Sequence, residues 1–117
     1  MVKMVQAKVS YDSEEDSLFL YRSGVRSKGS VIAGNFILDL SHKGTVKGIE
    51  IMKATKTLSI VEDRKIPKEF FKHIQKANIR TKIENNIVYG VFSLVSLVER
   101  KKEVVDSYVQ IPLMATG

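Results

Sequence analysis

Two carboxylates, Asp39 and Glu50, occupy apolar stretches on either side of a predicted turn at Gly44. If that turn joins neighbouring strands, the two carboxyl groups could share a proton and act as acid and base. A solvated outer sheet face explains the same residues, because ionisable groups in sheets are usually hydrated or paired. An enzyme or metal-binding protein that uses this pair is therefore our third functional hypothesis, behind two non-catalytic ones.

A second group of carboxylates, from Asp12 to Asp16, is of the type that hard cations such as calcium favour. The spacing does not fit a calcium loop, since Ser17 and Ser23 stand where a glycine and a bidentate glutamate are needed. We interpret the segment as a solvated hairpin turn in which Asp12 accepts backbone hydrogen bonds. With two histidines and no cysteine in the chain, we predict no catalytic residue, no metal site and no cofactor.

Basic residues recur every three or four positions from 65 onward, in a chain whose formal net charge is +6. The set is Lys65, Lys68, Lys72, Lys76 and Arg80. On one helix face such residues could neutralise phosphates and bind nucleic acid. However, no aromatic side chains are interleaved for base stacking, and a solvated lysine face also accounts for the pattern. Nucleic-acid binding is thus the alternative function.

The apolar pattern predicts an α+β fold dominated by antiparallel strands. Alternation with period two marks strands at 5–11, 18–22, 36–40 and 46–54, and again at 79–83, 87–98 and 104–113. Between these groups lies one amphipathic helix, Pro67–Asn78, which turns Phe70, Phe71, Ile74 and Ala77 to the core. We expect residues 1–117 to form a single domain, in which two meanders or one bent sheet pack around this helix.

Four local signals refine this prediction. A β-bulge at Gly48 would restore the phase of the strand that contains it. Asn85 and Asn86 tolerate left-handed conformations and favour a tight hairpin. The strand at 87–98 is apolar in both alternating rows, so we expect it to be central and covered on both faces. For residues 57–61, a helical turn and a strand both remain open.

A set of spaced residues supports a family resemblance. The pattern consists of Tyr11, Asp12 and Asp16, then Asp39, and finally Gly48 and Glu50. Over residues 9–58, it resembles the uncharacterised family called domain of unknown function 2283. The resemblance implies a small prokaryotic, cytoplasmic protein with a β-meander, and an antitoxin or partner-binding role; it carries over no catalytic residue and leaves the helix and final strands at 62–117 unexplained.

Composition sets the remaining expectations. The chain has no cysteine, residues 1–10 lack the apolar core of a signal peptide, and the charge-free run at 87–98 is too short to cross a membrane. We therefore expect a cytoplasmic protein without membrane contact. The leading function is a non-catalytic protein-binding or regulatory module, with an exposed strand edge that recruits a protein partner or a second copy as a homodimer.

Overall fold

The computed structural model describes residues 4–112, which form two antiparallel sheets and two short helices. The four-stranded sheet has the order β1-β7-β8-β9, and the five-stranded sheet has the order β2-β3-β6-β5-β4. The elements are β1 (Val5–Gln6), β2 (Lys8–Asp12), β3 (Ser17–Tyr21), β4 (Ser27–Ala33), β5 (Phe36–Ser41), β6 (Val46–Ile51), α1 (Ala54–Glu62), α2 (Lys68–Lys72), β7 (Ile74–Glu84), β8 (Ile87–Val98) and β9 (Lys101–Pro112). The α+β class with antiparallel meanders is confirmed.

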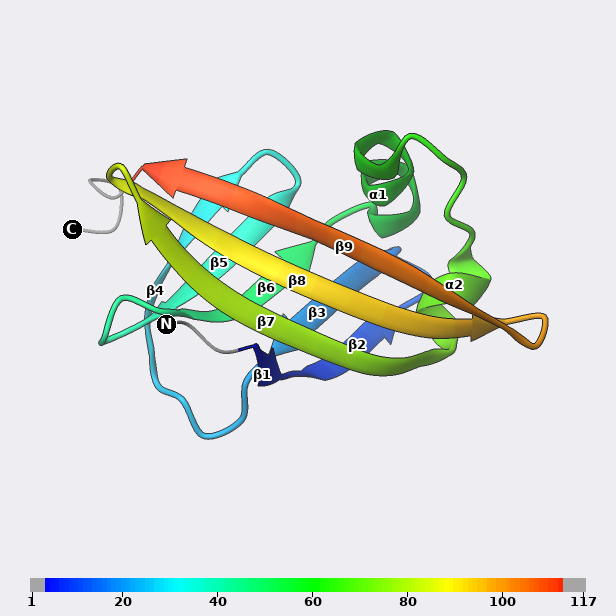
Figure 1. Ribbon diagram of the computed structural model, residues 1–117, viewed down its shortest axis with the longest axis horizontal. Coiled ribbons are helices and arrows are strands. Elements are labelled where there is room, and N and C mark those ends of the chain that lie inside the picture. Colours follow the sequence, from blue (N-terminus) through cyan, green and yellow to red (C-terminus); the bar gives the residue numbers. More distant parts are fainter. Residues whose placement is uncertain (1–3, 113–117) are drawn as a thin grey trace.

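The two sheets pack face to face, and Figure 1 views them from the side of the four-stranded sheet, with its long strands in front of the five-stranded sheet. Every second residue of β8 points into the space between the sheets, including the buried Val88, Phe92 and Leu94. Leu38, Ile49 and other buried side chains of the five-stranded sheet complete one continuous hydrophobic cluster. The core therefore lies between two sheets rather than around a central helix.

The bulge expected at Gly48 is confirmed. Asp39 pairs with Gly48 and Leu40 pairs with Val46, so Lys47 is the additional residue directly before the glycine. This shift leaves the N–H of Val46 without a partner in its own sheet. Thr81 Oγ1 of the opposite sheet accepts that hydrogen bond at 2.8 Å, which explains a threonine in the buried row of β7.

The helix predicted over Pro67–Asn78 is wrong in its extent. Helix α2 ends at Lys72, and β7 begins at Ile74 and pairs with β8 along its length. Phe70 and Phe71 are buried as predicted. Beyond them, apolar residues fit helical and strand periods alike, and the long ladder with β8 outweighs the weak local helix preference.

Other boundaries also differ from the sequence prediction. The first predicted strand divides at Ala7, because β1 pairs with β7 whereas β2 pairs with β3. Residues 57–61, for which two conformations were open, lie within α1. The hairpin at Asn85 and Asn86 is confirmed, and both residues have positive φ. Among residues 4–112, neither helix is long and apolar enough to span a membrane.

The strand β8 is central, as predicted, but it is covered on one face only. The row that faces away from the core contains half-buried or exposed residues throughout. Figure 1 shows no other element of the described chain in front of this face. The prediction that β8 is covered on both faces is therefore wrong for the outer face.

Candidate binding surface

The spacing of Tyr11 and Asp16 has a structural explanation. The phenol of Tyr11 donates a 2.6 Å hydrogen bond to Asp16 Oδ1. The other carboxylate oxygen accepts from the backbone N–H of Thr55 at 3.1 Å and from its hydroxyl at 2.5 Å. Helix α1 has no side-chain cap of its own at Lys53, so Asp16 supplies the capping acceptor from a distant turn. These residues hold α1 against the five-stranded sheet.

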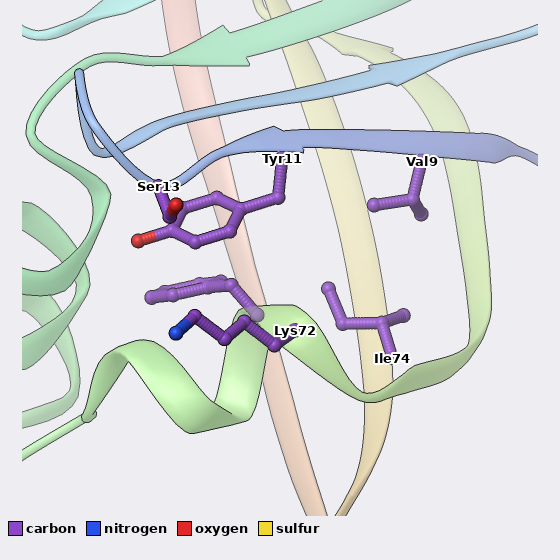
Figure 2. Close-up of a pocket in the computed structure, with 6 residues that line it drawn as sticks. Val9, Tyr11, Ser13, Lys72 and Ile74 are labelled. Carbon is purple, nitrogen blue, oxygen red and sulfur yellow. The ribbon is translucent and has the colours of Figure 1, made fainter.

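Tyr11 also anchors α2. Its ring packs against that of Phe71 with centroids 5.2 Å apart. Figure 2 shows Tyr11 and Val9 pointing from β2 toward Lys72 and Ile74 across a shallow groove. Burial, with the neighbouring Asp16 carboxylate, raises the pKa of the Tyr11 phenol above its usual range. The packed rings of Tyr11 and Phe71 thus line one part of the groove.

The two carboxylate groups singled out by the sequence have different surroundings. Asp12 accepts hydrogen bonds from the N–H groups of Glu14 and Glu15, as expected for a hairpin turn. Asp39 and Glu50 lie on neighbouring strands but not opposite each other, since Asp39 pairs with Gly48. The Asp39 carboxylate accepts a hydrogen bond from the Ser30 hydroxyl. Across residues 4–112, no three histidine or acidic side chains gather as potential metal ligands.

The predicted basic stripe does not lie on one helix face. Lys65 lies in the linker before α2, and only Lys68 and Lys72 belong to that helix. Lys68 Nζ donates to the Ser13 carbonyl at 2.8 Å, and Lys72 forms a 3.6 Å ion pair with Glu69. Lys76 and Arg80 lie on β7 instead. The helix-based nucleic-acid surface is therefore not formed as predicted.

A different surface emerges on the outer face of the four-stranded sheet, which we call the outer face. Its centre is the outward row of β8, which is apolar except for Ser93: Ile87, Tyr89, Val91, Ser93, Val95 and Leu97. On β9, the residues opposite this row include Val104 and Tyr108, which are 43% and 57% exposed. The ring of Tyr108 meets that of Tyr89 edge-on, with centroids 5.7 Å apart. The outer face thus carries an apolar strip, the row on β8, which Val104 and Tyr108 extend onto β9 between the polar residues Lys102, Asp106 and Gln110.

Positive charge borders this strip along β7. Lys76, Arg80 and Lys82 pair with Val95, Val91 and Tyr89 respectively, so their side chains lie on the same face. Lys82 Nζ lies 5.7 Å from the centre of the Tyr89 ring and forms a 3.0 Å ion pair with Glu84. The Nε of Arg80 is buried and has no hydrogen-bond partner within the described residues. The face therefore combines apolar contact area with cationic groups on one side.

Sequence reasoning missed this combination of residues, although both of its signals were visible. One signal was the apolar character of both rows at 87–98, and the other was the alternation of basic residues at 80 and 82. The two could be joined only once β7 was known to pair with β8. Tyr108 required the register of β9 as well.

The comparisons with known proteins cover different parts of the chain. No solved structure matches the chain. An uncharacterized protein of Methanocaldococcus jannaschii is 29% identical over 105 residues, which cover 90% of this chain and 85% of that protein. An alignment of that length includes most of the four-stranded sheet. Residues 8–54 match the family described as protein of unknown function DUF2283; this confirms the resemblance predicted from the sequence and places it on the five-stranded sheet and the start of α1.

Proposed function

We propose that the protein is a non-catalytic protein-binding module that docks a partner on the outer face. The observation that carries this proposal is the apolar outward row of β8, a central strand whose other face already fills the core. A sheet that packs on the core with one face only normally has polar residues on its other, solvated face. An apolar strip of this kind is typical of a surface that another molecule covers.

The charges on β7 indicate the chemistry of that partner. Lys76, Arg80 and Lys82 form a positive border on one side of the apolar strip. An acidic or carbonyl-rich rim around an apolar centre would complement both features. We therefore infer a protein partner with acidic groups beside its contact patch. The antitoxin-like role implied by the family resemblance, with a toxin-like protein as partner, is one such interaction.

Variants of the outer face test the proposal. Proteins captured from an extract by the wild type would be identified, purified and titrated against Val95→Glu, which puts a charge into the strip, and against Ile32→Glu. Ile32 is an exposed apolar strand residue on β4, so its variant is the matched control. We expect at least about tenfold weaker binding by Val95→Glu, because a carboxylate opposite Lys76 interrupts the apolar row and neutralises part of the positive border, and unchanged binding by Ile32→Glu. Equal binding of a purified partner by all three proteins would exclude the outer face.

Nucleic-acid binding is a second candidate, and one observation favours it. Lys82 lies over the Tyr89 ring beside Tyr108, so this face has the aromatic groups that the helix lacked. Single strands bind by stacking on aromatic rings and by phosphate contacts. Fluorescence anisotropy with oligonucleotides of about 16 nucleotides would detect it, with affinity that falls as salt rises and falls further in Tyr89→Ala. The absence of binding at low salt would eliminate this candidate.

A further inference from the structure

The long strand β9 is an edge strand with an open outer side. It pairs with β8 along its whole length, and within residues 4–112 no strand pairs with its other side. The orientation of its peptide groups follows from β8. Leu97 N–H donates to the His73 carbonyl on the β7 side, so the odd-numbered residues of β8 direct their N–H and C=O groups toward β7. The even-numbered residues of β8 therefore direct theirs toward β9. The partners of these residues on β9 are odd-numbered, so the N–H and C=O groups of the even-numbered residues of β9 point away from β8.

This outward row is blocked at two places. At one end, Arg64 Nη2 donates a 2.8 Å hydrogen bond to the Val104 carbonyl, and Arg64 Nη1 is held 3.5 Å from Glu103. At the other end, Pro112 has no N–H to donate. Between them, Asp106, Tyr108 and Gln110 present both their N–H and C=O groups outward. No hydrogen bond to these six groups exists in the described chain.

We propose that β9 pairs antiparallel with β9 of a second copy of this chain, about a twofold axis at Tyr108. The Arg64 hydrogen bond to Val104 and the missing N–H of Pro112 determine this register. Val104 and Pro112 each lie four residues from Tyr108, so they come opposite each other in the dimer. The Val104 carbonyl then needs no donor, because Arg64 already supplies one, and Pro112 of the second copy has none to give. The Val104 N–H remains available for the Pro112 carbonyl.

The side chains agree with the same register. Asp106 comes opposite Gln110 of the second copy, and an amide can donate to the carboxylate with no like charges in contact. On the axis the two Tyr108 side chains meet, each already in contact with Tyr89 of its own sheet. Tyr108 is 57% exposed, so the contact removes aromatic surface from water.

Helix α1 adds apolar surface near this edge. It lies beside β9 in Figure 1, and the hydrogen bond from Arg64 joins the segment after it to that strand. Its Ile60 and Val61 are exposed. Backbone pairing alone covers little area, and a stable interface needs such apolar contacts around it. A strand of another protein could also pair with β9, but nothing would require that strand to lack a donor opposite the Val104 carbonyl and to have a carbonyl that already accepts a hydrogen bond opposite Pro112.

Light scattering after size exclusion tests the dimer, with an expected mass of twice 13.2 kDa. Tyr108→Pro removes an outward N–H but no bond to β8, so the fold is kept, and we expect dimerisation weakened about 10–100-fold. Val95→Glu is the control, because Val95 lies on β8, one strand away from the edge, and does not contact Tyr108 in the register of the two strands. It should remain dimeric. A monomeric wild type at the highest accessible concentration, or a Tyr108→Pro variant that dimerises as well as the wild type, would overturn the proposal.

Cysteine crosslinking tests the register, since the chain has no cysteine of its own. In Tyr108→Cys the two sulfur-bearing residues face each other with Cα atoms about 5.5 Å apart, which a disulfide can span. In Gln110→Cys the equivalent residues are offset by four positions, more than about 13 Å. Oxidation should crosslink the first variant and not the second. The reverse result would refute this register. Because Val95→Glu changes only the outer face, it should stay dimeric, so failure of the proposed docking function is separable from failure of the dimer.

Discussion

Removal of the Asp16 carboxylate is expected to destabilise the protein more than any other single change in the acidic turn. Asp16→Gly is the informative substitution, because Asp16 has φ of 53°, which glycine adopts without strain. The change removes the acceptor for the Tyr11 phenol and for two donors of Thr55. Loss of a helix cap costs about 1 kcal/mol. Leaving a partly buried donor unpaired costs about 1–3 kcal/mol. The free energy of unfolding should therefore fall by about 2–4 kcal/mol.

Urea unfolding followed by far-ultraviolet circular dichroism measures this loss. Asp12→Ala is the control, because its carboxylate accepts two N–H groups in an exposed turn, and it should cost less than about 1 kcal/mol. A double-mutant cycle with Tyr11→Phe should show that the two residues are coupled, since they share one hydrogen bond. A loss below about 0.5 kcal/mol for Asp16→Gly, or strictly additive effects with Tyr11→Phe, would refute the capping role.

Three further predictions concern the packing. The pKa of Tyr11 is raised in the folded state above its unfolded value of about 10. The contribution of Tyr11 to the free energy of unfolding is therefore fully present below about pH 10 and is lost as pH rises above it, because the phenol of the unfolded chain ionises first. Tyr11→Phe should reduce this loss in urea titrations at increasing pH. Gly48→Ala places a Cβ 3.0 Å from the Leu20 carbonyl and should cost about 1–3 kcal/mol, whereas Gly90→Ala meets only side-chain ends and should cost less in the same assay. Because both sheets share one core, circular dichroism and tyrosine fluorescence should report a single coincident thermal transition, and two separate transitions would contradict the single-domain expectation.

The strands were predictable because their rows alternate and their turns have distinctive residues. The strand at 87–98 was predicted with its observed bounds, and Asn85 and Asn86 fixed the hairpin before it. The bulge before Gly48 was also visible, since Val46 is out of phase with Ile49 and Ile51. In each case the signal lies within a few residues of its effect.

The helices were not predictable in the same way. Helix α1 contains Thr55, Thr57, Ile60 and Val61, which are β-branched and have weak helix propensity. Its start depends on Asp16, which is 39 residues before Thr55. Such a distant capping interaction leaves no local pattern in the sequence. Helix α2 was overextended for the opposite reason, because Ile74 and Ala77 continue the helical period although the chain there pairs with β8.

The same misassignment hid the candidate site. If residues up to Asn78 were helical, Lys76 and Arg80 would belong to different elements, and no aromatic residue would lie beside them. Once they are placed in β7, alternation puts both on the face that also carries Tyr89. The charges predicted for one helix are therefore divided between the linker at Lys65, α2, where Lys68 and Lys72 contact neighbouring groups, and the outer face.

The two proposed interactions use different parts of the four-stranded sheet, one its outer face and the other its β9 edge, so both can form at the same time. Docking on the outer face covers the row of β8 from above, whereas dimerisation extends the sheet sideways from β9. A pair of copies joined through β9 would have both outer faces on the same side, with their β7 borders at opposite ends. A partner with two acidic patches could then engage both copies at once, and such bivalent contact would strengthen binding without new contacts in either site. Dilution to the monomer should consequently weaken binding of such a partner, and equal binding by the dimer and the monomer would show that only one face is used.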